Sequence, residues 1–264
     1  NLYDNPEYVP VIGELMPSRW AYEAVTVHQF KGNRFSREFF EIDQVSFNAS
    51  FEIARIQDIE QRLNEIHWSP GDQLPESHEA DLKLIRHELD QISQTKVVAS
   101  FGPLEGFTAS GFNETVYMIA RDSLDRARQR YMMQKYYADS VRDARALEMA
   151  RVWGGEQAYI DMKRDHTNDR LEELLVRNTR TFLVQWNDRL VRKIAPVYQE
   201  PRSRIARAHL FAPMKRVGAF SMDTYWFNLM VIWVLTLVFY LTLVYDLLRK
   251  IVSWNQIRLL RKNQ

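Results

Sequence analysis

The stretch Tyr225 to Tyr245, YWFNLMVIWVLTLVFYLTLVY, runs without a charged side chain between Asp223 and Asp246. At a rise of about 1.5 Å per residue, a helix of this length measures about 31 Å, which matches a hydrocarbon core of about 30 Å. Most of its residues are Leu, Ile, Val or Phe, and these together favour insertion by about 4–7 kcal/mol. The sequence therefore predicts a transmembrane helix within 222–248.

Aromatic side chains gather at both ends of this stretch. Tyr225 and Trp226 open it, and Tyr240, Tyr245 and Trp254 lie near or beyond its far end. Such clusters are typical of the two membrane–water interfaces, where amphipathic rings are enriched. The alternative is a buried helix in the core of a large soluble protein, in which this arrangement of aromatic residues is uncommon.

The charge distribution gives the predicted helix a direction. The chain has 35 Lys and Arg against 34 Asp and Glu, but the segment after Asp246 contains bases and no acid. These bases are Arg249, Lys250, Arg258, Arg261 and Lys262. Because fewer bases precede the helix at a comparable distance, the positive-inside rule predicts a cytoplasmic tail over 249–264. Everything before the helix is then expected on the outer side of the membrane.

The composition excludes several classes of function. The net charge of +1 argues against nucleic-acid binding driven by bulk charge, and the absence of cysteine excludes disulfides, thiolate metal sites and cysteine catalysis. No GxxxxGK[ST] loop, HExxH pair or GxSxG elbow is present. Asp165 and His166 are sequence neighbours, which point about 100° apart on a helix and favour a solvated pair. We predict no catalytic, cofactor-binding or metal site in this chain.

Residues 35–221 are predicted to form a helical extracytoplasmic domain, so the expected fold class is all-α. Apolar residues recur every three to four positions over 51–66 and 82–92, on either side of a break, which predicts a long antiparallel helical hairpin. The opposite, charged faces of these helices are a solvated surface or, alternatively, a face that binds a partner.

The rest of the domain is also expected to be helical. Beyond a loop or short strand over 96–107, long helices are predicted over 113–153, 156–178 and 179–194. Two consecutive glycines separate the first two of these helices. The segment 203–221 is expected to lead the chain back to the bilayer.

A short amphipathic helix is predicted near the N-terminus, over PSRWAYEAVTVHQF at 17–30. Ser18 is a candidate N-cap, and Gly32 with Asn33 is expected to end the helix. Its apolar face consists of Trp20, Ala24, Val27 and Phe30. At this length the helix cannot span a bilayer, so it is either an ordinary core helix or one that lies in the outer leaflet.

The same segment carries a family resemblance. SRWAYEAVTVHQF followed by KGNRF resembles the short outer-leaflet helix after the fifth transmembrane helix of G-subfamily (White-type) ATP-binding-cassette transporters. The stretch from His209 to Ile251 resembles the approach to, and the body of, the last transmembrane helix in large bacterial members of that class. The two motifs cover about 60 residues of the chain.

This resemblance implies roles for particular residues. It assigns the outer-leaflet helix to Ser18, Arg19, Trp20, Tyr22, Glu23 and Ala24. It places the ends of the final helix at Asp223, Thr224, Phe227, Asn228 and Asp246. The polar residues within the span, Asn228, Thr236 and Thr242, are candidates for hydrogen bonds between helices, worth about 0.6 kcal/mol each.

The resemblance also implies an organisation for the whole protein. Residues 1–34 hold the outer-leaflet helix and a connection, 35–221 the external domain, 222–248 the last transmembrane helix and 249–264 the basic tail. The chain is then the C-terminal part of an exporter permease that works as a homodimer in a bacterial inner membrane. ATP and Mg are expected in a nucleotide-binding domain elsewhere in the parent protein, with no cofactor in this segment.

The chain departs from the family pattern in two respects. Vertebrate members usually have cysteines in this external loop, whereas this chain has none, and its loop is far longer. A bacterial cell-envelope protein is therefore expected, and the resemblance gives no role to the extra domain. The alternative function is a single-span tether that displays a helical interaction domain without transport. A receptor's sensor domain would require an output domain after Gln264.

Overall fold

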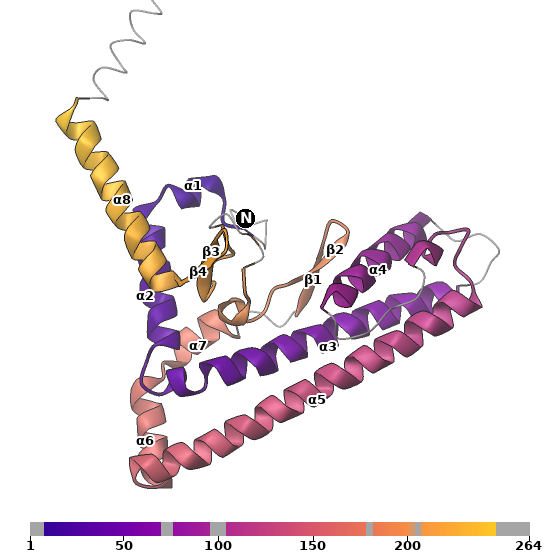
Figure 1. The fold of residues 1–264 in the computed structure, drawn as a ribbon, viewed down its shortest axis with the longest axis horizontal. Helices are drawn as coiled ribbons and strands as arrows, with labels where there is room; N and C mark the ends of the chain where they lie inside the picture. Colours follow the sequence, from indigo (N-terminus) through magenta and orange to yellow (C-terminus); the bar gives the residue numbers. More distant parts are fainter. Residues whose placement is uncertain are drawn as a thin grey trace, which may run out of the picture.

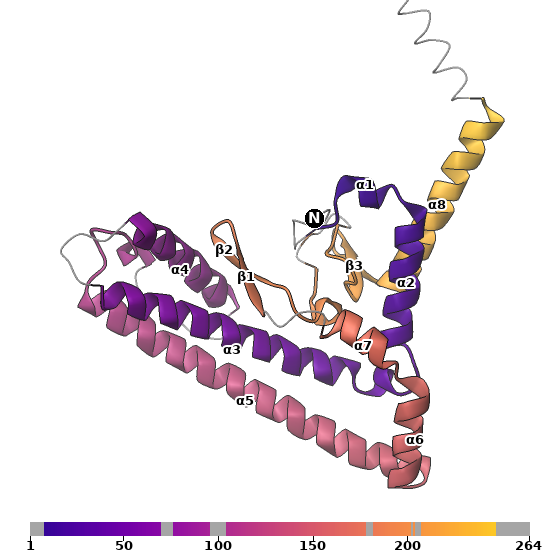
Figure 2. The ribbon, with the colours of Figure 1, turned by 180° about the vertical axis from the view of Figure 1, so that it is seen from behind.

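The computed structural model describes residues 8–69, 76–95, 104–177, 182–201, 203 and 207–246. It is mostly helical with four short strands, so the expected all-α class holds only approximately. Figures 1 and 2 show an elongated molecule with two arms. We call the arm that contains α2 and α8 the short arm, and the arm built from α3, α4 and α5 the long arm.

In the short arm, α2 (Pro17–Lys31) lies side by side with α8 (Thr224–Val244), and α1 (Val11–Glu14) precedes α2. The antiparallel strands β3 (Met214–Val217) and β4 (Phe220–Asp223) form a hairpin that leads directly into α8. Gly218 turns this hairpin with φ 62°, a conformation that glycine adopts without strain. The predicted return segment 203–221 therefore contains strands.

The predicted transmembrane stretch is one helix, α8, whose bounds lie within one residue of those of the charge-free stretch. The Asp223 side chain caps it by accepting a hydrogen bond from the Tyr225 amide at 3.0 Å. The helix is long and apolar enough to cross a membrane, and very little of it is buried against the rest of the chain. Trp233 and Leu243, for example, are 68% and 76% exposed, so α8 is not the core helix of a soluble domain within the described residues.

The long arm joins α3 (Phe40–His67), α4 (Glu76–Gln94) and α5 (Glu114–Trp153), with α5 running along α3 (Figure 1). The predicted pairing of 51–66 with 82–92 is confirmed, since their apolar stripes share one core. This core includes Ile56, Ile59, Leu63, Ile85, Leu89, Leu124 and Ala127, all fully buried. The longest shared surface is nevertheless between α3 and α5, which the sequence pattern did not indicate.

The helix α5 begins and ends where the sequence predicts. The Asn113 side chain accepts a hydrogen bond from the Val116 amide at the start, and Gly154 adopts φ 105° at the end. A helix C-terminus of this kind needs a left-handed residue, which glycine supplies. The 3-10 turn Leu104–Gly106 precedes α5, while most of the predicted loop 96–107 lies outside the described residues.

The helix predicted over 156–178 is two helices, α6 (Glu156–His166) and α7 (Asp169–Leu175). Between them, the Asn168 side chain accepts hydrogen bonds from the amides of Arg170 and Leu171 and so caps α7. An asparagine that satisfies the amides of a new helix favours a break over continuation of the old one. The prediction of a single helix was therefore wrong.

The helix predicted over 179–194 was also wrong. Its described part forms the antiparallel strands β1 (Leu183–Trp186) and β2 (Arg189–Arg192), joined by a tight turn at Asn187, whose φ is 53°. The Leu190 side chain enters the long-arm core, and the Leu190 amide donates to Glu88 Oε1 at 2.9 Å. This tertiary contact outweighs the local periodicity. The 3-10 turn Pro196–Tyr198 follows the hairpin.

Candidate functional site

The most unusual feature of the short arm is a buried carboxylate on α2. The side chain of Glu23 is 0% exposed, and its Oε1 accepts hydrogen bonds from Lys215 Nζ at 2.7 Å and from the Phe211 amide at 3.1 Å. Its Oε2 accepts from Asn228 Nδ2 at 3.0 Å and from an Arg19 guanidinium nitrogen at 3.3 Å. We call Arg19, Glu23, Lys215 and Asn228 the polar junction, because they join α2, β3 and α8.

The charges of the polar junction balance once Glu14 is included. Arg19 also contacts Glu14 Oε1 at 3.4 Å, so two cations face two carboxylates. Burial lowers the pKa of Lys215 below its ordinary value, although the nearby Glu23 carboxylate acts in the opposite direction. Burial raises the pKa of Glu14, and the cations Arg19 and Lys215 oppose this shift. A buried charge set of this kind requires every partner to stay in place.

Trp20 covers the polar junction. Its ring centroid lies 3.9 Å from the Arg19 guanidinium carbon and 5.9 Å from Lys215 Nζ, within the range of cation–π attraction. The Trp20 indole N–H donates to the Glu14 carbonyl at 2.8 Å, and its ring lies 6.1 Å from that of Phe227 on α8. The indole therefore excludes water from the ion pairs and packs α2 against α8 at the same time.

Asn228 ties the first part of α8 to α2. Its Nδ2 donates to the Trp20 carbonyl at 3.1 Å as well as to Glu23, and the side chain is fully buried. One turn earlier, the Thr224 hydroxyl donates to the Ala212 carbonyl at 2.5 Å. The Asn228 Oδ1 atom accepts no hydrogen bond within the described part of the chain. Polar groups thus fix α8 both to α2 and to the segment before β3.

A second pair of contacts lies further along the interface between α2 and α8. Lys31 Nζ contacts Asp223 Oδ2 at 2.6 Å, and the rings of His28 and Tyr225 lie 4.5 Å apart. Since the end of α2 meets the beginning of α8, the two helices are antiparallel. The Lys31–Asp223 pair is only partly buried, so solvent screens it more than the polar junction.

The structure brings together residues that the sequence assigned to separate motifs. Of the six residues assigned to the outer-leaflet helix, Arg19, Trp20, Glu23 and Ala24 are buried, whereas Ser18 and Tyr22 are exposed. Ser18 is not the N-cap, because α2 begins at Pro17 and its N-cap is Met16. Proline suits the first helical position, where no amide donor is needed.

The other predicted site residues behave differently. The hydroxyls of Thr236 and Thr242 donate to the carbonyls of Ile232 and Phe239 in their own helix, so within the described residues only Asn228 among the span's predicted polar positions bonds to another helix. The predicted anchor residues Arg249, Lys250, Arg258, Arg261 and Lys262 lie outside the described residues.

Sequence reasoning missed the role of Lys215, because no pattern distinguishes it from the other bases that precede the helix. Lys215 is 1% exposed although its neighbours on β3 include the charged residue Arg216. The available signal was on α2, where Glu23 shares the buried face with Trp20 and Ala24. A carboxylate in such a position requires a cationic partner.

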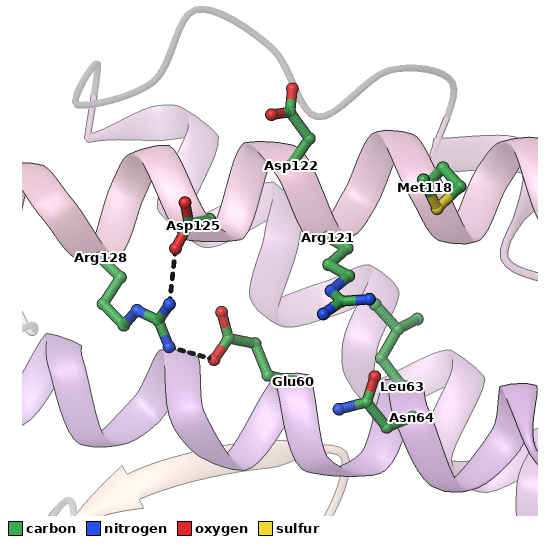
Figure 3. A pocket seen from close by; sticks show the side chains of 8 residues that line it. All are labelled: Glu60, Leu63, Asn64, Met118, Arg121, Asp122, Asp125 and Arg128. Atoms are coloured by element: carbon green, nitrogen blue, oxygen red, sulfur yellow. Dashed lines mark hydrogen bonds and ion pairs between the residues drawn. The ribbon is translucent and has the colours of Figure 1, made fainter.

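A shallow groove of about 590 Å³ between α3 and α5 offers no comparable chemistry (Figure 3). Figure 3 shows the Arg128 guanidinium between two carboxylates, at 2.9 Å from Glu60 and 2.5 Å from Asp125. Burial raises the pKa of Glu60, and the charge of Arg128 opposes this shift. This ion-pair arrangement stabilises the helix pair and lacks a nucleophile with an adjacent base.

The part of the chain that the structure describes contains no group of three or more His, Asp or Glu side chains that could hold a metal ion. Comparison of the chain with models of known protein families, with curated proteins and with solved structures finds no match. The polar junction is therefore the candidate functional site on its geometry alone. It connects α8, the one helix among the described residues that is both long and apolar enough to cross a membrane, to an amphipathic helix and to the return hairpin.

Proposed function

We propose that this chain is the membrane-spanning permease portion of an ATP-driven ATP-binding-cassette exporter, with an enlarged external domain between its last two transmembrane helices. One observation carries the proposal. Two sequence motifs about 200 residues apart, each resembling part of such a permease, contribute Arg19, Glu23 and Asn228 to one buried polar junction. The two motifs were identified separately in the sequence. Their burial in one junction supports the interpretation that both belong to one permease.

In this proposal, the polar junction makes α2, the β3–β4 hairpin and the first part of α8 move as one body. Movement of α8, driven by ATP hydrolysis in a nucleotide-binding domain of the parent, is then passed to the outer end of the permease. ATP and Mg bind in that domain, and this chain supplies no cofactor site. The partners are the lipid bilayer, the remaining transmembrane helices and a second copy of the permease in a homodimer.

The proposed location is a bacterial inner membrane, with the large domain outside and the C-terminus in the cytoplasm. Because this chain contains no cysteine, single cysteines report topology without background from its own residues. Ser140→Cys on the exposed face of α5 should react with a membrane-impermeant maleimide in sealed spheroplasts. Ser253→Cys in the basic tail should react only after permeabilisation. The reverse pattern overturns the topology and the exporter assignment with it.

The transport function itself needs the parent protein in lipid nanodiscs. The parent should hydrolyse ATP in the presence of Mg, and Asn228→Leu should lower the rate because it removes the bonds that link α8 to α2. Trp233→Leu, an exposed apolar exchange on the same helix, serves as the control. Absence of ATP hydrolysis by the parent, or of a nucleotide-binding domain in it, contradicts the proposal.

One observation favours the second candidate, a single-span tether for an interaction domain. Large apolar side chains are exposed along the outer face of α5, with Met133, Tyr136 and Tyr137 at 69%, 72% and 72%. Side chains of this type are typical of protein interfaces. A parent that lacks further apolar spans and a nucleotide-binding domain favours this candidate over the exporter.

A further inference from the structure

A second cavity, separate from the polar junction, lies at the corner where the two arms meet. It has a volume of about 370 Å³, which is within the usual range of about 300–1,000 Å³ for small-molecule sites. Its lining comes from the end of α2, the beginning of α3, α5, α6 and α7. Figures 1 and 2 show α6 and α7 bridging this corner between the end of α5 and the base of α2.

Aromatic rings form much of the lining. Tyr198 lies 4.7 Å from Phe47, 5.3 Å from Phe40 and 5.9 Å from Phe30, measured between ring centroids. A second group contains Phe35 and Phe39, whose centroids are 5.0 Å apart. We call this space the aromatic cavity. Of these rings, Phe30 and Phe47 are only partly buried, so they offer apolar surface to a ligand's own ring.

The acidic groups of the aromatic cavity are already engaged. Asp43 Oδ1 contacts Arg142 Nε at 2.6 Å, and Glu172 contacts Arg177 at 2.7 Å. Asp139 accepts a hydrogen bond from the Ser46 hydroxyl at 2.7 Å and forms an ion pair with Lys135. None of these carboxylates therefore needs a cationic ligand.

The basic residue Lys163 on α6 remains without an acidic partner among the described residues. The Lys163 ammonium, which lines the cavity, forms no ion pair there. His166 Nδ1 lies 3.1 Å from the Met162 carbonyl, which can only accept, so Nδ1 carries the hydrogen. In the neutral ring the other nitrogen, Nε2, is then an acceptor, so it cannot donate to an anion. The unmatched charge of the aromatic cavity is positive.

We propose that the aromatic cavity binds a small amphipathic anion, with a flat apolar body among the phenylalanine and tyrosine rings and one carboxylate or sulfonate group against Lys163. The volume fits one fused-ring molecule and excludes a two-chain phospholipid. All of the lining residues lie outside α8, so binding to the cavity can be tested without ATP-driven transport.

The test uses the whole chain in nanodiscs and naphthalene-2-sulfonate as the probe, followed by ligand-detected NMR against empty nanodiscs. Saturable binding is expected, and methanesulfonate, which keeps the charge without the rings, should not displace the probe. Lys163→Gln should weaken binding about tenfold, the factor typical of one charge-assisted hydrogen bond. Lys163 is exposed, so this variant is expected to fold normally.

Arg164→Gln is the matched control, because Arg164 is the next residue on α6 and does not line the cavity. Its affinity for the probe should equal that of the wild type. Binding no greater than that of empty nanodiscs overturns the proposal. Equal effects of Lys163→Gln and Arg164→Gln also overturn it, because the probe is then attracted by surface charge alone.

Discussion

The two arms of the molecule each contain one fully buried glutamate, and the two glutamates are built into different kinds of structure. Glu88, in the long arm, pairs with Arg55 and accepts the Leu190 amide, so its partners belong to α3 and β2. Glu23, in the short arm, pairs with Lys215 and bonds to Asn228 of α8. Each carboxylate joins a hairpin to a helix, but only Glu23 contacts α8, the helix that is both long and apolar enough to cross a membrane.

The two cations respond differently to burial. Burial acts to lower the pKa of Arg55, but the carboxylates of Glu52 and Glu88 outweigh it, and the pKa lies above its ordinary value. At Lys215 burial outweighs the Glu23 carboxylate, and the pKa lies below its ordinary value. Arginine stays charged at every accessible pH, whereas a buried lysine can release its proton. The long arm therefore holds a permanent charge pair, and the short arm holds one that depends on pH.

The largest effect is expected from Glu88→Ala. It leaves the buried Arg55 charge with Glu52 as its remaining carboxylate partner and removes the acceptor of the Leu190 amide, which should cost about 3–5 kcal/mol. Site-resolved hydrogen exchange should show lost protection in α3 and α4 and unchanged protection in α2. Glu79→Ala, an exposed exchange on α4, is the control. If α2 loses as much hydrogen-exchange protection as α3 and α4, the two arms do not unfold independently.

The next effect concerns His209, beside the polar junction. Burial lowers its pKa to about 4, although the hydrogen bond to the Pro196 carbonyl at 2.8 Å opposes this shift. Below its ordinary pKa of 6.5 the unfolded chain binds a proton that the folded chain does not bind. Stability present above pH 6.5 is therefore lost as the pH falls to 4, by about 3 kcal/mol.

Urea titrations across this pH range measure the effect of His209. The variant His209→Gln keeps an N–H donor for the Pro196 carbonyl. Its free energy of unfolding should change less between pH 6.5 and 4 than that of the wild type. If the free energy of unfolding of this variant changes with pH as steeply as that of the wild type, a group other than His209 causes the pH dependence.

A smaller effect, which depends on pH in a more alkaline range, is expected from Glu23→Gln. The exchange should lower the free energy of unfolding by about 2 kcal/mol at pH 7. This is less than for Glu88→Ala, because Lys215 can lose its proton whereas Arg55 stays charged. As the pH rises toward about 10, the unfolded chain still binds the lysine proton that the folded variant releases, so the deficit should shrink. The deficit of Glu88→Ala should stay constant over the same range. Hydrogen exchange of α2 provides the measurement, with Glu41→Gln on the exposed face of α3 as control.

The smallest effect is expected from Asp223→Asn. Asparagine still caps α8, so the exchange removes only the partly exposed pair with Lys31. The loss should be below about 1 kcal/mol and should vanish at high salt, where surface charges are screened. Denaturant titrations at low and high salt measure it. A salt-independent loss above about 2 kcal/mol means that this outer pair, rather than the polar junction, holds the two helices together.

Local signals in the sequence were sufficient for several elements. The charge-free stretch before Asp246 predicted α8, the spacing of apolar residues predicted the packing of α3 on α4, and Asn113 with Gly154 bounded α5. Each of these depends on residues within a few turns of one another. The same local signals failed at 179–194, because the strand pairing there depends on Glu88 and the long-arm core, which lie about a hundred positions away.

The sequence by itself determined that one helix is apolar enough to enter lipid, and that most of the remaining chain is helical, because burial of apolar side chains follows the helical period. The helical spacing of Trp20, Ala24, Val27 and Phe30 also predicted α2. Only the tertiary structure decided that Glu23 meets Lys215 and Asn228, and that the long arm pairs α3 with α5. A buried charge needs oppositely charged or hydrogen-bonding partners at the right distance. These partners can come from any part of the chain, so no local sequence pattern predicts them.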